Sequence, residues 1–236
     1  MTVRCHCEPF GSLRIGSAKQ SHMHIPDGFL NIPVSACAAA VSLGGLALAI
    51  RNVQKKLQDR LIPLMGVLAA FIFAAQMFNF PVAGGTSGHL LGGVLAAIVV
   101  GPWAATVVLT CVLIVQCLLF QDGGLIALGA NILNMAIIGT WGGWTVMTII
   151  NSLPFVRGGL GWGRSVAIFL GAWFSVVVAS IAAALELAIS GTAPLTVTFV
   201  AMAGIHAIIG VGEGIITLLI VSFLKRVKPE LLSPPL

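Results

Sequence analysis

Charged residues are scarce in this chain. They make up 8% of its 236 residues, and 58% of the residues are hydrophobic, whereas about 25% charged residues is usual in soluble domains. A water-soluble protein of this length cannot bury so much apolar surface, so the composition predicts a polytopic membrane protein. The net charge of +5 does not indicate a nucleic-acid partner, because the basic residues lie between apolar segments, where they set orientation in the membrane.

Several motifs are absent as well. The five cysteines include no Cys-x-x-Cys pair, so no disulfide framework is expected. Cys37, Cys111 and Cys117 lie inside apolar segments and are expected to be small buried residues. The chain has no Gly-x-x-x-x-Gly-Lys-[Ser/Thr] motif for ATP and no His-Glu-x-x-His motif of a zinc protease.

Apolar segments separated by Gly, Pro and charged residues dominate the rest of the chain. A bilayer core is crossed by about 20 helical residues and excludes exposed strand edges. The fold class is therefore predicted to be all-α, a polytopic bundle of about seven transmembrane helices, with residues 23–226 as one membrane domain and 227–236 as a cytoplasmic tail. The predicted spans cover 32–50, 61–78, 89–101, 103–120, 125–150, 165–188 and 196–224.

Basic residues cluster in three of the connections between these spans. With seven spans, all three clusters fall on one side of the membrane, which the positive-inside rule makes the cytoplasm. The segments 23–31, 79–88, 121–124 and 189–195 are then predicted to face outward. The clusters are Arg51, Lys55, Lys56 and Arg60, then Arg157 and Arg164, and finally Lys225, Arg226 and Lys228.

Residues 1–22 differ from the rest of the chain. They contain no apolar stretch of 7–15 residues, which argues against a secretory signal peptide. Cys5-His6-Cys7 is only a weak metal signal, because a tetrahedral site needs a fourth ligand and more room. We expect a disordered leader, or sequence upstream of a misplaced start at Met23.

A candidate metal site begins at Met23 and His24. If Met23 were the N-terminus, its amine, the amide nitrogen of His24 and the His24 imidazole could chelate one metal ion. Only metals that favour tetragonal nitrogen fields, Ni(II) and Cu(II), readily displace the amide proton. His89, which ends a glycine-rich outer loop, is the candidate fourth donor, although a histidine at such a boundary is often just a hydrogen-bonded side chain.

Other polar residues within the apolar spans are candidate supporting groups. His206 and Glu213 share one helical face, and Glu213 is expected to pair with an Asn, Gln or Ser side chain. Asn131 and Asn134 lie three apart and are expected to donate hydrogen bonds near the outer face. The alternative role for each is structural hydrogen bonding between helices. The residues that could support the metal ligands without binding the metal themselves are His206, Asn131, Asn134 and Asn79.

Four motifs together resemble a known family. The chain is similar to the substrate-binding membrane subunit of cobalt/nickel energy-coupling-factor (ECF) transporters, the CbiM/NikM type, over about residues 23–226. The motifs are Met-His-Ile-Pro-Asp-Gly-Phe-Leu at 23–30, Asn-Phe-Pro-Val-Ala-Gly-Gly-Thr-Ser-Gly-His at 79–89, Leu-Gly-Ala-Asn-Ile-Leu-Asn-Met-Ala at 128–136 and His-Ala-Ile-Ile-Gly-Val-Gly-Glu at 206–213.

The resemblance implies a helical bundle in the cell inner membrane that captures Co²⁺ or Ni²⁺ from outside, without a prosthetic group. It assigns the metal to the amine of Met23, the amide nitrogen and imidazole of His24, and His89. The implied partners are a transmembrane coupling (T) component, cytoplasmic ABC ATPases (A components) and a small accessory membrane subunit. Imported cobalt would feed cobalamin synthesis. Because residues 1–22 would block the amine of Met23, we expect translation to start at Met23.

Two other function classes stay open at this point. A membrane metalloenzyme would need an open coordination position and substrate turnover. A self-sufficient secondary metal transporter would favour inverted repeats and acidic relays within the membrane. The residues also leave the choice between cobalt and nickel open.

Overall fold

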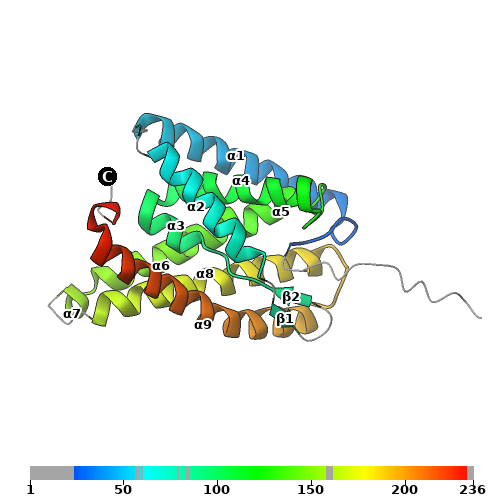
Figure 1. The fold of residues 1–236 in the computed structure, drawn as a ribbon. Coiled ribbons are helices and arrows are strands. Elements are labelled where there is room, and N and C mark those ends of the chain that lie inside the picture. The colour runs from blue at the N-terminus through cyan, green and yellow to red at the C-terminus, as the bar shows by residue number, and fades with distance from the viewer. Residues whose placement is uncertain are drawn as a thin grey trace, which may run out of the picture.

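The computed structural model describes residues 24–56, 59, 61–78, 80–82, 86–157 and 162–232. The described chain is a bundle of helices with one short hairpin at one end (Figure 1). Each of the seven predicted apolar segments contains a helix, so the all-α prediction is confirmed. The helices are α1 Ile32–Lys56, α2 Leu61–Gln76, α3 Gly93–Val100, α4 Pro102–Phe120, α5 Leu128–Asn131, α6 Thr140–Ser152, α7 Pro154–Arg157, α8 Trp162–Ile189 and α9 Leu195–Val227.

Five of the helical segments in the described chain are long and apolar enough to cross a membrane. They are α1, α4, the continuous run 128–152, α8 and α9. The run 128–152 joins α5 to α6 through a π-helix, Ile132–Gly139, in which backbone hydrogen bonds reach one residue further than in an α-helix. The remaining two apolar segments form shorter helices: α2 has 16 residues and α3 has 8.

The inner and outer helices of the bundle differ in burial. In α4 and in α8, 56% of an apolar 18-residue stretch is buried. The corresponding share is 22% in α1 and 28% in α9. Large apolar side chains on the outer helices are exposed, among them Ile32 at 80% and Ile208 at 74%. Such surfaces suit lipid, because the bilayer core solvates apolar side chains and no water has to be excluded.

The surface corrects one expectation about cysteine. Cys37 and Cys111 are exposed on the outside of the bundle, and of the three only Cys117 is buried. An apolar helix in lipid has no polar face that marks the outside, so the apolar character of a segment does not tell which of its residues are buried.

A small antiparallel hairpin lies in the glycine-rich connection between α2 and α3, where no strand was predicted. β1 Phe80–Val82 pairs with β2 Thr86–Gly88, and Phe80 lies opposite Gly88. The hairpin lies at the same end of the bundle as the segment before α1, the start of α5 and the connection from α8 to α9 (Figure 1). These are the four segments predicted to share one side of the membrane.

The opposite end of the bundle holds the connection from α1 to α2, the helix α7 and the end of α9 (Figure 1). The predicted basic clusters belong to these connections. A 3₁₀-helix, Pro229–Leu231, comes after α9. The chain therefore has one end rich in basic residues and one end that holds the candidate histidines.

Candidate metal centre

His24 is held at the hairpin end of the bundle by its neighbour Ile25. The side-chain amide of Asn131 binds the backbone of Ile25 on both sides: Ile25 N–H donates to Oδ1 (2.8 Å), and Nδ2 donates to Ile25 O (3.2 Å). Gly124 N–H donates to the same carbonyl oxygen (3.0 Å). These three bonds place the His24 side chain inside the bundle, where it is 1% exposed.

Asp27 fixes the same segment a second time. Its carboxyl group accepts hydrogen bonds from three consecutive backbone N–H groups, those of Leu125 (3.0 Å), Ile126 (2.8 Å) and Ala127 (3.2 Å). These groups lie in the turn that leads into α5, which begins at Leu128, and backbone N–H groups at the entry to a helix favour negative charge. The partners of Asp27 are 98 to 100 residues away in sequence.

Gly123 and Gly124 leave room for this packing. A Cβ atom built on Gly123 would lie 2.9 Å from His24 Cβ and 3.0 Å from Asn131 Nδ2, and one on Gly124 would overlap the backbone and carboxyl group of Asp27. Gly123 also has a φ of +94°, which favours glycine. The segment 24–27 can lie against residues 123–127 only because both positions lack side chains.

His89 meets His24 from the other side. It comes directly after β2, and its side chain is fully buried. The centroids of the two imidazole rings are 4.9 Å apart, and the ring planes are tilted by 47°. The structure thus brings together two predicted donors that are 65 residues apart in sequence.

The hydrogen bonds of His89 define its tautomer. Its Nδ1 lies 2.7 Å from Leu90 O, and because a carbonyl oxygen only accepts, Nδ1 carries the proton. Burial, and then the neighbouring His24, lower the pKa of His89 to about 3. The ring is therefore neutral at pH 7, with the lone pair of Nε2 available, and Nε2 has no hydrogen-bond partner in the described chain.

His24 has a carboxyl group beside its ring. Its Nδ1 lies 3.0 Å from Asp122 Oδ1, and Asp122 is 12% exposed. The predictions from sequence did not include Asp122, which precedes Gly123 in a loop predicted only to face outward. Asp122 follows α4 and precedes two glycines, a pattern that does not indicate a metal site. The neighbouring His24 is what makes it notable.

His206 lies close to Gly88, the residue before His89. It is 2% exposed on α9, and a Cβ atom built on Gly88 would lie 3.8 Å from His206 Nε2. His206 Nδ1 contacts Met202 O (2.6 Å), so Nδ1 is the donor, and Nε2 has no hydrogen-bond partner in the described chain. The predicted role of His206 as a supporting group of the metal stays a prediction.

Glu213 binds backbone instead of a side chain. Its carboxyl oxygens accept hydrogen bonds from the N–H groups of Leu91 (2.9 Å) and Gly92 (2.7 Å). The expectation that it pairs with an Asn, Gln or Ser side chain is wrong. Residues 89–92 precede α3 without helical structure, and their backbone groups need partners inside the bundle.

Two glutamines complete the support of this irregular segment. Gln76 on α2 donates through Nε2 to Leu91 O (2.8 Å), and Gln116 on α4 donates to Gln76 Oε1 (3.0 Å). Both glutamines are buried. The backbone next to His89 is therefore held by side chains from α2 and α9.

The other predicted supporting residues divide into two groups. Asn131 binds Ile25 through its side-chain amide. Asn134 donates to Glu186 Oε2 on α8 (2.7 Å), and no hydrogen bond between Asn134 and either histidine of the pair is found in the described chain. Met23 and Asn79 lie outside the described residues.

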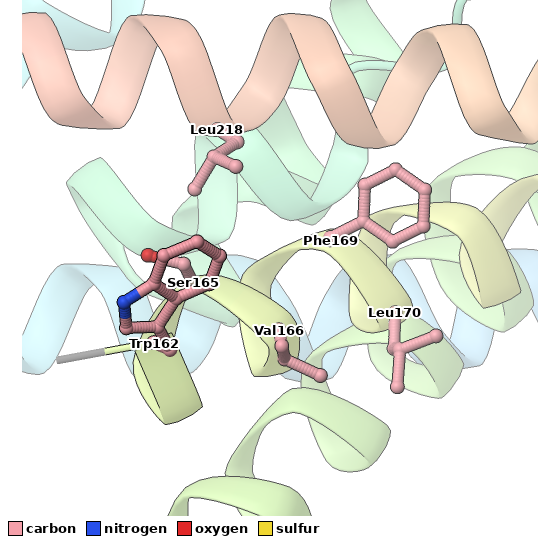
Figure 2. Close-up of a pocket in the computed structure, with 6 residues that line it drawn as sticks. All are labelled: Trp162, Ser165, Val166, Phe169, Leu170 and Leu218. Atoms are coloured by element: carbon pink, nitrogen blue, oxygen red, sulfur yellow. The ribbon is translucent and has the colours of Figure 1, made fainter. Parts of the chain in front are cut away.

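The side chains alone do not complete a metal site in the described part of the chain. No group of three His, Cys, Asp or Glu residues there is arranged to hold a metal ion. The described chain provides two adjacent imidazoles with unpartnered nitrogens. Further donors would have to come from the backbone or from Met23. A larger apolar groove lies elsewhere, between α8 and α9 (Figure 2).

Comparison with known proteins identifies the family. The model of a family described as CbiM, cobalt uptake substrate-specific transmembrane region, matches residues 24–231. This chain belongs to the CbiM family. The CbiM family consists of transport proteins, so the membrane-enzyme alternative is excluded, and the chain is a multi-pass transmembrane component of cobalt/nickel uptake.

Relatives within the CbiM family agree over most of the chain. The cobalt transport protein CbiM of Kyrpidia tusciae is 33% identical, and the match covers 89% of this chain and 86% of that protein. The fused nickel transport protein NikMN of Rhodobacter capsulatus is 34% identical over 90% of this chain and 64% of its own length. A crystal structure of a truncated transition metal transporter superposes with a TM-score of 0.78, at 33% identity, over 86% of this chain and 99% of that one.

Proposed function

We propose that this CbiM-family chain is the substrate-capture subunit of an ATP-driven ECF importer and binds Co²⁺ or Ni²⁺ between His24 and His89. The main support is the pair itself: two buried imidazoles with centroids 4.9 Å apart, in which His89 Nε2 has no hydrogen-bond partner in the described chain and His24 Nδ1 lies beside the carboxyl group of Asp122. Buried polar atoms are normally satisfied, and an exception calls for a ligand or ion.

The proposed ligands are four nitrogens: the amine of Met23, the backbone amide nitrogen of His24, and the imidazoles of His24 and His89. Of the two ring nitrogens of His24, only Nδ1 can close a chelate ring with the residue's own amide nitrogen. That atom faces Asp122 at 3.0 Å. A bound cation would therefore lie beside a carboxyl group, which would balance part of its charge.

The distribution of basic residues supports a site on the outer face. The described residues of the three basic clusters belong to elements at the end of the bundle opposite the hairpin (Figure 1). By the positive-inside rule that end is cytoplasmic. The cell membrane is thus crossed with His24 and His89 towards the outside, where free metal enters.

Partner subunits would supply the energy for transport. The sequence has no nucleotide-binding motif, so separate ATPases and a transmembrane coupling component are required. One relative is a fused NikMN protein of which this chain covers 64%, which favours a small accessory membrane subunit as a further partner. A carrier that works without ATPases would instead accumulate metal when it is reconstituted alone.

Calorimetric titration of the purified protein with Ni²⁺ and Co²⁺ tests the binding site. The alanine variants of His24 and His89 should lose binding while the protein still inserts in the membrane, and His6→Ala in residues 1–22 should retain it. A chain that starts at Met23 should bind Ni²⁺ more tightly than the whole 236-residue chain, because its amine is free. Normal binding by both His24→Ala and His89→Ala would overturn the proposed site.

A further inference from the structure

An apolar groove runs between the start of α8 and the end of α9 (Figure 2), at the end of the bundle opposite the β1–β2 hairpin (Figure 1). We propose that it binds an acyl chain of an anionic phospholipid whose headgroup contacts Lys225 and Arg226. Metal capture makes no use of this groove, so the proposal is independent of that function. The groove has a volume of about 680 Å³ and is lined by Trp162, Ser165, Val166, Phe169, Leu170 and Leu218.

The register between α8 and α9 locates the open end of the groove. A Cβ atom built on Gly210 would lie 2.9 Å from Trp173 Cδ1, and one on Gly214 would lie 2.5 Å from Phe169 Cδ2. A step of four residues towards the C-terminus of α9 therefore matches a step of four residues towards the N-terminus of α8. Continued by one turn, this register puts Leu218 level with the first turn of α8, so the last turns of α9 extend past the start of α8.

Two cationic side chains lie just beyond the groove. Lys225 is seven residues after Leu218, which places it on the same face of α9 about 10 Å further along the helix. Arg226 is the next residue, and both are exposed in the last turn of α9. In the described chain neither forms an ion pair, whereas the nearby Lys228 contacts Glu230 at 3.5 Å.

The depth of the groove in the bilayer favours lipid as the occupant. The 28 residues of α8 span about 42 Å, more than the hydrocarbon core of about 30 Å. Trp162 at its start is 81% exposed, as is usual for tryptophan at the interface between membrane and water. The groove then opens into the hydrocarbon while Lys225 and Arg226 lie at headgroup level, an arrangement that favours anionic headgroups.

Arg164 provides a control at the same end of the bundle. It lies two residues after Trp162, and therefore roughly 200° around α8 from the groove face. It is exposed, like Arg51 near the end of α1. Substitution of Arg164 and Arg51 by Gln removes the same two charges as substitution of Lys225 and Arg226, without touching the groove.

The test measures quenching of Trp162 fluorescence by lipids with brominated acyl chains. The full chain is placed in phosphatidylcholine nanodiscs that contain brominated phosphatidylglycerol or, in a parallel sample, brominated phosphatidylcholine. The difference between wild type and Trp162→Phe isolates the signal of Trp162. We expect stronger quenching by the anionic lipid, with a preference of roughly fivefold for each basic group involved.

The variants decide the interpretation. The preference should disappear in the Lys225→Gln/Arg226→Gln protein and persist in the Arg51→Gln/Arg164→Gln protein. Equal quenching by both lipids in wild type would overturn the proposal, as would equal loss in both double variants, which would indicate only a general surface charge. Absence of quenching by either lipid would show that something other than lipid covers the groove and would equally overturn it.

Discussion

The carboxyl group of Glu213 receives the backbone N–H of Gly92 at 2.7 Å, with Leu91 N–H at 2.9 Å on its other oxygen. One side chain on α9 thus fixes the two residues that join His89 to α3. The contact spans 121 residues of sequence. It links the end of the hairpin connection to the helix that also carries His206.

Glu213→Gln should weaken metal binding and lower the thermal stability of the protein. The amide keeps the shape but offers one acceptor oxygen in place of two, and its NH₂ group would face a backbone donor. Loss of a buried hydrogen bond to a charged group costs roughly 1.5–3 kcal/mol. Calorimetric titration with Ni²⁺ measures the affinity, and a thermal melt measures the stability.

Glu186→Gln is the matched control for Glu213. Glu186 also lies within the bundle, but it binds the side chain of Asn134, and its replacement should affect the melting temperature more than the affinity for metal. If Glu213→Gln lowers the melting temperature and leaves both the affinity and the absorption spectrum of bound Ni²⁺ unchanged, the residue supports the fold without positioning His89.

Asp122→Asn should lower the affinity for metal by roughly tenfold or more, the usual cost of removing a group that supports a metal ligand. Asp122 lies 3.0 Å from the ring nitrogen of His24 that would face the metal, and its negative charge offsets that of the cation. Asp59→Asn, an exposed position between α1 and α2, carries the same change in charge. Equal affinities of the two variants would show that Asp122 has no part in binding.

Gly123→Ala should disturb the site, and Gly191→Ala should not. Both glycines have a positive φ, +94° and +75°, so an alanine costs roughly 1–2 kcal/mol at either position. Only at Gly123 would the new Cβ meet His24 Cβ, at 2.9 Å, whereas nothing lies within 4 Å at Gly191. Comparison of the two nickel affinities at equal folded fraction isolates the displacement of His24.

Acid should weaken nickel binding, and the protons involved should not come from His89. Burial keeps the pKa of His89 at about 3, so this ring is already neutral when metal arrives near pH 7. The proposed site instead releases one amide proton and, below about pH 8, a proton from the amine. Affinity should fall by up to 100-fold for each pH unit in that range.

Calorimetry in buffers of different ionisation enthalpy counts the protons released. A count near two supports the backbone chelate, and a count of zero contradicts it.

For the metal-free protein, His89 also sets the direction in which stability changes with pH. The unfolded His89 ring takes up a proton below about pH 6.5 and the folded ring only near pH 3. This group therefore stabilises the fold above pH 6.5, and that contribution is lost as the pH falls from 6.5 to 3.

The apolar runs of the sequence predicted the helices well, because a membrane span needs about 20 apolar residues in succession. The histidine pair was also predictable, since His24 and His89 stand in segments that the positive charges place on one side. What the sequence did not reveal were contacts between distant segments. Asp122, Asp27 and the backbone partners of Glu213 belong to this class.

The reasons for these omissions are physical. The partners of Asp27 and Glu213 are main-chain N–H groups, which every residue except proline has, so no residue type marks them. The short β1–β2 hairpin, with three residues in each strand, is too short to show an alternating pattern. Cys37 and Cys111 are exposed because lipid contact does not require polarity.

The segment in front of α1 is anchored at three successive points before any metal arrives. Ile25 binds Asn131 and Gly124, Asp27 binds residues 125–127, and Phe29 O accepts a hydrogen bond from the Thr192 hydroxyl. The entropy cost of ordering this segment is therefore incurred during folding rather than during metal capture. The incoming ion meets donors that are already in place. Escape of the ion through this segment would require these anchors to break together, which would make dissociation slow.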